Sequence, residues 1–182
     1  MVRFMCQLHC LLCSCIGHVQ VFDSVHEEIL SADTIKQICC IVRSKRSSIK
    51  IDIMDVCQQT GTVDCGLFAL AYATTLCNGE LPQYKNYIQK EMRSHLIKCL
   101  QESTPTASPF PSSNRNLQHD VKRTKSVSLH CSCRLPEDPE KRMIQCVVCS
   151  VWYHEDCEPV VESAWIDENY PWKCRKCAAK AK

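Results

Sequence analysis

Apolar residues recur at two spacings along the first hundred positions. Strict alternation of apolar and polar residues predicts two strands, at residues 18–23 and 48–56. Apolar residues three and four positions apart predict three helices, at residues 31–44, 65–76 and 83–100. The order strand, helix, strand, helix, helix predicts an α/β or α+β fold for this part of the chain.

The ends of the predicted elements carry signals of their own. Asp23 ends the first strand, and either Ser31 or Asp33 can cap the first helix. Asn78 and Gly79 are typical of the end of a helix, so the second helix is expected to stop there.

Composition divides the chain into three parts. Residues 1–101 are periodic and poor in glycine, residues 102–129 are dominated by Ser, Thr and Pro, and residues 130–178 are rich in cysteine. The middle part is predicted to be a flexible linker. It ends in a small basic cluster, which is either a weak nuclear localisation signal or solvated linker charge: Lys122, Arg123 and Lys125.

Cysteine is the unusual residue, at 17 of 182. The odd number and the Cys-x-x-Cys pairs beside a histidine indicate metal ligands in a reducing compartment rather than a disulfide scaffold. Eight residues of the last part have the spacing of zinc ligands: Cys131, Cys133, Cys146, Cys149, His154, Cys157, Cys174 and Cys177.

Eight soft or borderline ligands are enough for two tetrahedral zinc ions. Because all coordination positions are then filled, both ions are predicted to be structural. So short a segment buries too little apolar surface to fold alone, so zinc is expected to supply its folding free energy.

The pattern of four cysteines, one histidine and three cysteines, with "WYHEDC" and "PWKCRKC", resembles the PHD finger. A histidine in fifth place distinguishes it from RING fingers, which carry it fourth. The resemblance implies that alternate ligand pairs share an ion. One ion is then bound by Cys131, Cys133, His154 and Cys157, and the other by Cys146, Cys149, Cys174 and Cys177. His130 lies outside the pattern.

PHD fingers that read histone H3 tails add the tail as a strand and enclose methylated lysine in an aromatic cage. Trp152 and Met143 match two cage positions, although Trp152 could instead be a packing residue beside zinc. Glu137 takes a place where similar readers have Tyr, and with Asp138 it suits unmodified or less methylated lysine. Residues 130–177 contain 6 Lys and Arg against 9 Asp and Glu, which suits a basic tail.

Residues 58–77 suggest a different chemistry, that of a nucleophilic thiol. Cys65 opens an apolar helix, whose N-terminal end favours a thiolate. Gln59 precedes it across a loop at Gly61, so its amide is a candidate oxyanion donor. Asp23 is the candidate group for orienting a catalytic histidine.

The stretches "VFDS" and "QQTGTVDCGLFA" resemble the ubiquitin-like-protein-specific cysteine proteases, the SUMO-deconjugating family, and "MRSHLIKCL" looks like copies carried by mobile elements. The match covers the C-terminal half of that papain-like domain, so residues 1–101 are expected to be a truncated protease segment. His9 is the candidate catalytic histidine, because a turn near residues 14–17 places it opposite Asp23. His18 lies on the same strand as Asp23, about 16 Å away.

Charge and hydropathy indicate whether the chain is expected to bind nucleic acid or to cross a membrane. A net charge of +2 predicts no polybasic surface and no sequence-specific binding of nucleic acid, and no apolar run reaches membrane-spanning length. The run at residues 4–16 is read as a buried strand rather than a signal peptide, because Gln7 and His9 interrupt it. Five further cysteines fall on apolar faces and are predicted to be buried: Cys39, Cys40, Cys57, Cys77 and Cys99.

The sequence therefore predicts a nuclear, zinc-binding PHD-finger protein that reads a histone H3-like or other basic tail and carries an incomplete peptidase-like segment. The alternative is an active cysteine protease that cleaves conjugates or precursors of a ubiquitin-like protein, with the finger serving to localise it.

Overall fold

The computed structural model describes residues 10–14, 17–25, 29–102, 108–167 and 169–180. The chain divides into two compact units. The first comprises residues 1–28 and 50–125, and the second comprises residues 29–49 and 126–182. His9 lies outside the described residues, so the structure does not test it as the base of a catalytic triad.

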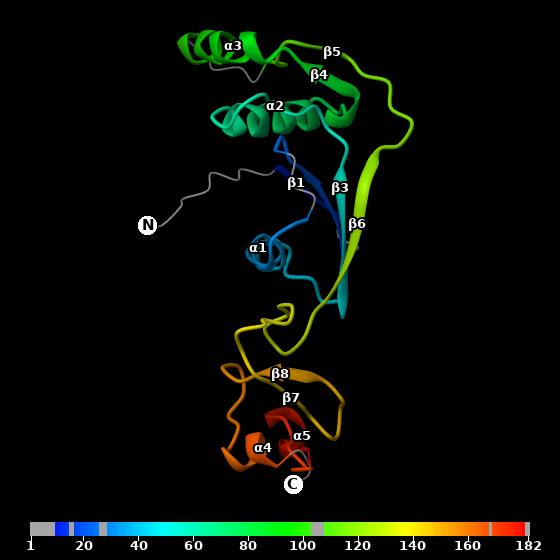
Figure 1. Cartoon of the computed structure of the whole chain (residues 1–182), viewed down its shortest axis with the longest axis vertical. Helices are drawn as coiled ribbons and strands as arrows, with labels where there is room; N and C mark the ends of the chain where they lie inside the picture. The colour runs from blue at the N-terminus through cyan, green and yellow to red at the C-terminus, as the bar shows by residue number, and fades with distance from the viewer. Residues whose placement is uncertain (1–9, 15–16, 26–28, 103–107, 168, 181–182) are drawn as a thin grey trace. The chain divides into compact units, whose positions relative to one another are not determined.

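A four-stranded sheet has the order β1-β2-β3-β6 (Figure 1). Strand β1 (Cys10–Ser14) runs antiparallel to β2 (His18–Phe22), and β2 runs parallel to β3 (Ser48–Met54). The long connection that a parallel pair requires contains helix α1 (Ala32–Val42). The two strands predicted from alternation are thus neighbours in one sheet.

Helix α1 begins and ends at the positions that its sequence favours. Ser31 is its N-cap, since its hydroxyl accepts a hydrogen bond of 3.1 Å from the Thr34 backbone N–H. Asp33 instead lies in the first turn. The helix ends at Arg43, which adopts a left-handed conformation.

Helix α2 (Cys65–Cys77) supplies two of the five aromatic residues in the core of the first unit. Phe68 and Tyr72 are buried, and their rings pack edge-on with centroids 6.0 Å apart. Tyr87 and Met92 complete the cluster from the chain that follows. The turn after α2 closes with a hydrogen bond from Gly79 N–H to the Leu76 carbonyl, as the Asn-Gly signal predicts.

The third predicted helix begins later than its apolar spacing indicates. Residues Pro82–Tyr84 form a short 3₁₀ turn, η1, and Lys85–Tyr87 form strand β4, so α3 covers only Gln89–Gln101. Strand β4 pairs antiparallel with β5 (Ser112–Asn114). Pairing with a distant segment therefore overrides the local helical pattern.

The segment predicted as a linker contains ordered structure. Besides β5 it contains β6 (Val121–Ser128), the edge strand of the four-stranded sheet, and Phe110 lies in the core of the first unit. Pro, Ser and Thr dominate the composition there, but a few apolar side chains are enough to anchor it. The basic cluster predicted for the linker lies on this edge strand, where charged residues discourage pairing with other chains.

The cysteine-rich segment has little regular structure. Strands β7 (Met143–Gln145) and β8 (Trp152–His154) form an antiparallel pair, followed by short helices α4 (Ser163–Ile166) and α5 (Arg175–Ala179). Its small core centres on Tyr153 and Trp172, whose rings lie 5.5 Å apart. Among the described helices of the whole chain, none has the length and apolar character needed to cross a membrane.

Candidate functional site

Turns and the β7–β8 hairpin bring distant cysteines together. The Cys131 N–H donates a hydrogen bond of 2.8 Å to the Trp152 carbonyl, which attaches the first ligand pair to β8. Val147 N–H donates to the Trp172 carbonyl at 3.0 Å, which attaches the last pair to the loop after β7. Each attachment joins segments that lie far apart in the sequence, so the ligand sets are assembled by backbone hydrogen bonds.

The first cluster contains Cys131, Cys133, His154 and Cys157, whose ligand atoms lie within 4.8 Å of one another. His154 Nδ1 lies 3.3 Å from the Cys133 sulfur and 4.0 Å from the Cys157 sulfur. The other ring nitrogen, Nε2, lies 3.0 Å from the Pro136 carbonyl, an acceptor only. Nε2 therefore holds the proton, and the lone pair on Nδ1 is directed at the cluster.

The second cluster contains Cys146, Cys149, Cys174 and Cys177, also within 4.8 Å of one another. The Cys149 and Cys174 sulfurs are 4.0 Å apart. Tetrahedral zinc with bonds of about 2.3 Å places two sulfurs about 3.8 Å apart, so the spacing fits this ion. The Cys174 N–H also donates to the Cys146 sulfur at 3.3 Å.

Backbone N–H groups lower the pKa of two of the cysteines, which favours the thiolate form that binds a cation. Burial raises the pKa of Cys131, but N–H groups of Cys133 and His154 outweigh it and lower that pKa to about 6. At Cys146, burial is likewise outweighed by backbone N–H groups, and its pKa is also about 6. Burial and neighbouring sulfurs raise the pKa of Cys157 to about 12. All the cysteines of such a cluster can be deprotonated, and can act as ligands at the same time, only when a cation is bound.

The ligand sets are the two that the sequence resemblance implied, and the donor atoms suit two structural zinc ions. The PHD-finger family model matches residues 131–177. These residues form a PHD finger. The finger occupies the last part of the chain, where the cysteine spacing predicted it.

Relatives match the chain over a similar length. A segment of 48 residues is 40% identical to the nucleosome-remodeling factor subunit NURF301-like of Caenorhabditis elegans, covering 26% of this chain and 2% of that protein. The chromatin remodeling protein SHL of Arabidopsis thaliana is 34% identical over 53 residues, 29% of this chain and 22% of that protein.

A zebrafish relative is a demethylase. Histone lysine demethylase PHF8 of Danio rerio is 49% identical over 37 residues, which cover 20% of this chain and 4% of that protein. The chain thus spans a small part of each of these relatives, between 2% and 22% of their length. These comparisons give no support to the protease resemblance of residues 1–101, which stays a prediction.

The candidate cage residues lie on one face of the β7–β8 hairpin. Met143 is paired with His154, and Gln145 with Trp152, so Met143 and Trp152 project from the same side. Trp152 is 42% exposed, whereas Tyr153, on the opposite face, is buried in the core. The exposure of Trp152 argues against a purely packing role beside zinc.

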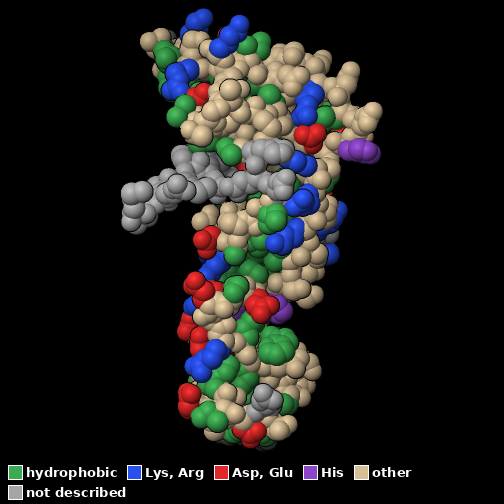
Figure 2. Space-filling model, in the orientation of Figure 1, with side chains coloured by type: hydrophobic (Ala, Val, Ile, Leu, Met, Phe, Trp, Pro, Cys, Tyr) green, Lys and Arg blue, Asp and Glu red, His purple; other side chains and the backbone are tan. Residues whose placement is uncertain are grey.

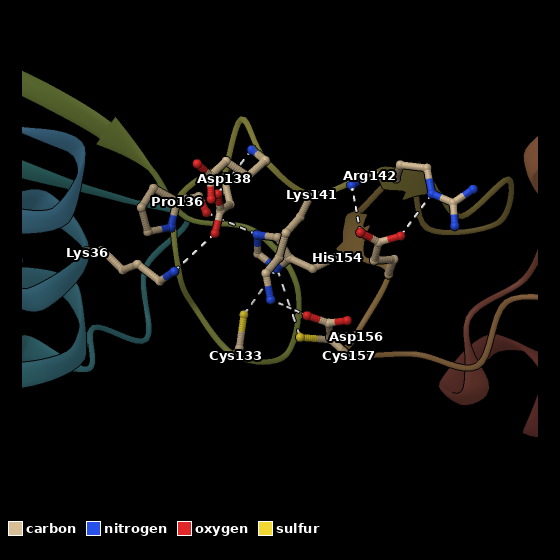
Figure 3. A network of polar contacts seen from close by, with 11 residues as sticks. Lys36, Cys133, Pro136, Asp138, Lys141, Arg142, His154, Asp156 and Cys157 are labelled. Atoms are coloured by element: carbon tan, nitrogen blue, oxygen red, sulfur yellow. Dashed lines mark hydrogen bonds and ion pairs between the residues drawn. The ribbon is translucent and has the colours of Figure 1, made fainter.

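Asp138 is engaged with a lysine from the same unit. The Lys36 ammonium, on α1, donates a hydrogen bond of 3.0 Å to the Asp138 carboxylate (Figure 3). This hydrogen bond holds the pKa of Asp138 below its ordinary value. A shallow pocket opens beside the pair and reaches the first zinc cluster, with Pro136 and Lys141 in its wall. Glu137 is exposed next to this pocket.

Arg142 has a set of partners that sequence reasoning missed. Its side chain donates to Glu155 at 2.9 Å, and its guanidinium lies 4.6 Å from the centre of the Trp165 ring (Figure 3 shows the Glu155 contact). Arg142 directly precedes β7, so an ion pair and a cation–π contact lie at the start of this strand. A third tryptophan in so short a segment was the signal available for finding Trp165.

The candidate protease residues occupy two adjoining segments of the first unit. The Ser24 hydroxyl donates to the Gln59 side-chain carbonyl at 2.8 Å, and the Gln58 amide donates to the Asp23 carbonyl at 2.9 Å. The end of β2 therefore lies beside the loop that leads to Cys65. The Gln59 amide donates to the Gly61 carbonyl at 2.7 Å, so in this structure it closes the loop.

Cys65 is the first residue of α2 and is 6% exposed. The N-cap residue, Asp64, makes no capping hydrogen bond with its side chain; its carboxylate accepts hydrogen bonds from Gln89, at 2.7 Å, and from Arg93 instead. Helix α3 thus holds the loop ahead of the thiol in place. The structure thus brings the segment that contains Asp23 beside the segment that contains Gln59, and it places Cys65 at a helix N-terminus.

Proposed function

We propose that the PHD finger binds an unmodified or less methylated lysine in a basic tail of the histone H3 class. The contact between Lys36 and Asp138 supports this proposal most directly, because the carboxylate accepts a hydrogen bond from a lysine ammonium. A trimethylammonium group has no N–H to donate, so Asp138 favours lysine with fewer methyl groups.

Three further observations support a basic peptide as the ligand. The β7–β8 sheet has only two strands in the described part of the chain, so the outer edge of β7 offers backbone groups for strand addition. Figure 2 shows acidic side chains along one side of the finger, at the bottom of the view, with few basic ones. The relatives include a histone lysine demethylase and a chromatin remodeling protein.

The site has two contributions in this proposal. Exposed Trp152, with Met143, supplies an apolar wall for the aliphatic part of the lysine, and Asp138 and Glu137 supply the charge. Histone tails are nuclear, so the nucleus is the proposed location. Lys36 occupies Asp138 in the free protein and is therefore a competitor for the incoming lysine.

Titration of the zinc-loaded full chain with H3-tail peptides tests the proposal. The peptides carry the same lysine with none, one, two or three methyl groups, and a scrambled peptide is the reference. The unmodified and monomethyl peptides are expected to bind most tightly. Trp152→Ala and Asp138→Asn should each weaken binding about tenfold, in keeping with cation–π and ion-pair contacts of about 1 to 2 kcal/mol.

Two variants sharpen the test. Lys36→Ala is expected to tighten binding, because it removes the competitor for Asp138. Ile166→Ala is the matched control, since Ile166 is another apolar residue of the finger, 76% exposed, and lies outside the proposed site. Equal affinity for all peptides, including the scrambled one, would refute the proposal.

The second candidate function is that of a cysteine protease acting on a ubiquitin-like protein, with Cys65 as nucleophile. The observation that favours it is the pair of hydrogen bonds that joins Asp23 and Ser24 to Gln58 and Gln59, ahead of a cysteine at a helix N-terminus.

A ubiquitin-like protein with a C-terminal vinyl sulfone tests this function, because it reacts with an active thiol in its binding groove. An active enzyme gives one adduct, on Cys65, that Cys65→Ala abolishes and Gln59→Ala slows. If folded protein gives no adduct on Cys65, the segment is not a working protease.

A further inference from the structure

A thiol, an imidazole and a hydroxyl meet at the C-terminal part of α3, in the first unit. The Cys99 sulfur lies 3.5 Å from His95 Nε2 and 3.1 Å from the Ser108 hydroxyl. The Ser108 hydroxyl lies 3.4 Å from His95 Nε2. His95 and Cys99 are four residues apart on one helix face, so α3 itself holds the pair together.

The surroundings of the imidazole favour a proton on Nε2. Besides the sulfur, this nitrogen faces the Ser108 backbone carbonyl at 3.3 Å, which is an acceptor only. If Nε2 carried no proton and accepted one from the thiol, its lone pair and a lone pair of the Ser108 carbonyl oxygen would face each other. These contacts accommodate a thiolate–imidazolium pair, because the Nε2 proton then lies between the carbonyl and the sulfur and the Ser108 hydroxyl can donate to the thiolate.

The imidazole is held in this orientation by packing. Its ring lies 5.0 Å from the ring of Phe110, which belongs to the buried core of the first unit. Cys99 is half-buried, so it is not enclosed in the core. The base is therefore pre-positioned and the nucleophile is partly exposed.

The other thiols of the first unit and of helix α1 differ from Cys99. Of the five cysteines predicted to be buried, Cys39 alone is buried, and Cys57, like Cys99, is half-buried. Cys40 and Cys77 are exposed rather than buried. Cys39 is buried as predicted, and burial, with the neighbouring Cys40, raises its pKa to about 11. Exposure alone would make Cys40 and Cys77 the more reactive sites, so they are internal references for Cys99.

We propose that Cys99 is a thiol-exchange site for small disulfides of the glutathione class. The Cys99 thiolate attacks one sulfur of the disulfide, the sulfur–sulfur bond of the small molecule breaks, and a mixed disulfide forms at Cys99. The released thiolate takes the proton from the His95 imidazolium. The disulfide is reduced to one free thiol while Cys99 is oxidised, and a second small thiol reverses the reaction.

The reactivity rests on His95 and Ser108 and not on the helix. Both His95 and Cys99 lie in the last two turns of α3, whose C-terminal end favours a cation and disfavours an anion. A thiol at this end of a helix without the other two groups is expected to be sluggish. The substitutions at His95 and Ser108 are therefore decisive.

The test treats the zinc-loaded full chain with glutathione disulfide at neutral pH and follows each cysteine by peptide mass spectrometry. Cys99 is expected to form the mixed disulfide at least tenfold faster than Cys40 and Cys77 in the same molecule. His95→Gln should bring the Cys99 rate down to theirs, and Ser108→Ala should lower it severalfold, with Cys40 and Cys77 unchanged in both.

The comparison within the unsubstituted protein needs no variant, so it holds even where His95→Gln folds poorly. Circular dichroism of each variant establishes that the fold is kept. A Cys99 rate no higher than those of Cys40 and Cys77 would overturn the proposal. So would a Cys99 rate that His95→Gln leaves unchanged in folded protein.

Discussion

Removal of zinc is expected to unfold the PHD finger and leave the helices of the first unit in place. Structural zinc contributes about 10 to 16 kcal/mol in comparable small domains. A domain of about 50 residues has a net stability of only about 2 to 8 kcal/mol. Loss of either ion therefore exceeds the stability available from the small core around Tyr153 and Trp172.

Tryptophan fluorescence reports the unfolding of the finger separately from changes in the first unit. The chain has 3 tryptophans, and all of them lie in the finger: Trp152, Trp165 and Trp172. Trp172 is 5% exposed, so its transfer to water should shift the emission to longer wavelength. Helices α2 and α3 belong to the first unit, so most of the far-ultraviolet circular dichroism should remain.

The assay is a titration with a zinc chelator, with emission and circular dichroism recorded on the same samples and zinc measured after dialysis. Added zinc should restore the emission, and magnesium should not, because thiolates prefer the softer ion. Trp172→Phe is expected to remove most of the shift. If protein shown to be free of metal keeps its native emission, the argument that zinc supplies the folding free energy of the finger is refuted.

Two predictions concern the first unit. Tyr72 is buried and donates a hydrogen bond of 2.6 Å to a backbone carbonyl. Tyr72→Phe should therefore lower the free energy of unfolding, measured by urea titration, by about 1 to 3 kcal/mol. Tyr84→Phe is the control, because Tyr84 is exposed and its loss should change this free energy little. Burial raises the pKa of Asp52, but hydrogen bonds from Thr124 and His18 outweigh it and hold that pKa below 3.8. The stabilisation by ionised Asp52 is therefore complete above about pH 4 and is lost as the pH falls through the lowered pKa of this carboxyl. In acid unfolding titrations, Asp52→Asn should not show this loss of stability. If the variant and the unsubstituted protein lose stability equally in acid, the lowered pKa of Asp52 is contradicted.

The hydrogen bonds of His18 show where reasoning along one strand was incomplete. Along β2 and the residue that follows it, the strand rise places His18 and Asp23 about 16 Å apart, too far for a contact. Parallel pairing of β2 with β3 instead places His18 beside Lys50, and its ring reaches Asp52. The partner comes from a strand that only the tertiary fold makes a neighbour.

The finger was the part that sequence determined most completely. The ligands of one metal ion must lie at fixed distances from one another. The spacing of the ligand pairs along the sequence, such as those that include Cys131, Cys146 and Cys174, therefore reveals the site. The strands at 18–23 and 48–56 and the helix beginning at Cys65 were predicted for a similar reason, because one buried face imposes a period on the residues. The helix at residues 83–100 was predicted to begin too early, because pairing of β4 with β5 has no local signal.

The sequence by itself thus determined the ligands of the two zinc clusters and the order of the main elements. Only the tertiary structure decided which polar side chains meet: Lys36 with Asp138, Arg142 with Glu155, and His95 with Cys99 and Ser108. It also revealed two strands, β5 and β6, in the segment predicted to be a linker. The physical reason is that periodicity and ligand spacing are local constraints, whereas the partners of a charge or of an edge strand depend on how distant segments pack.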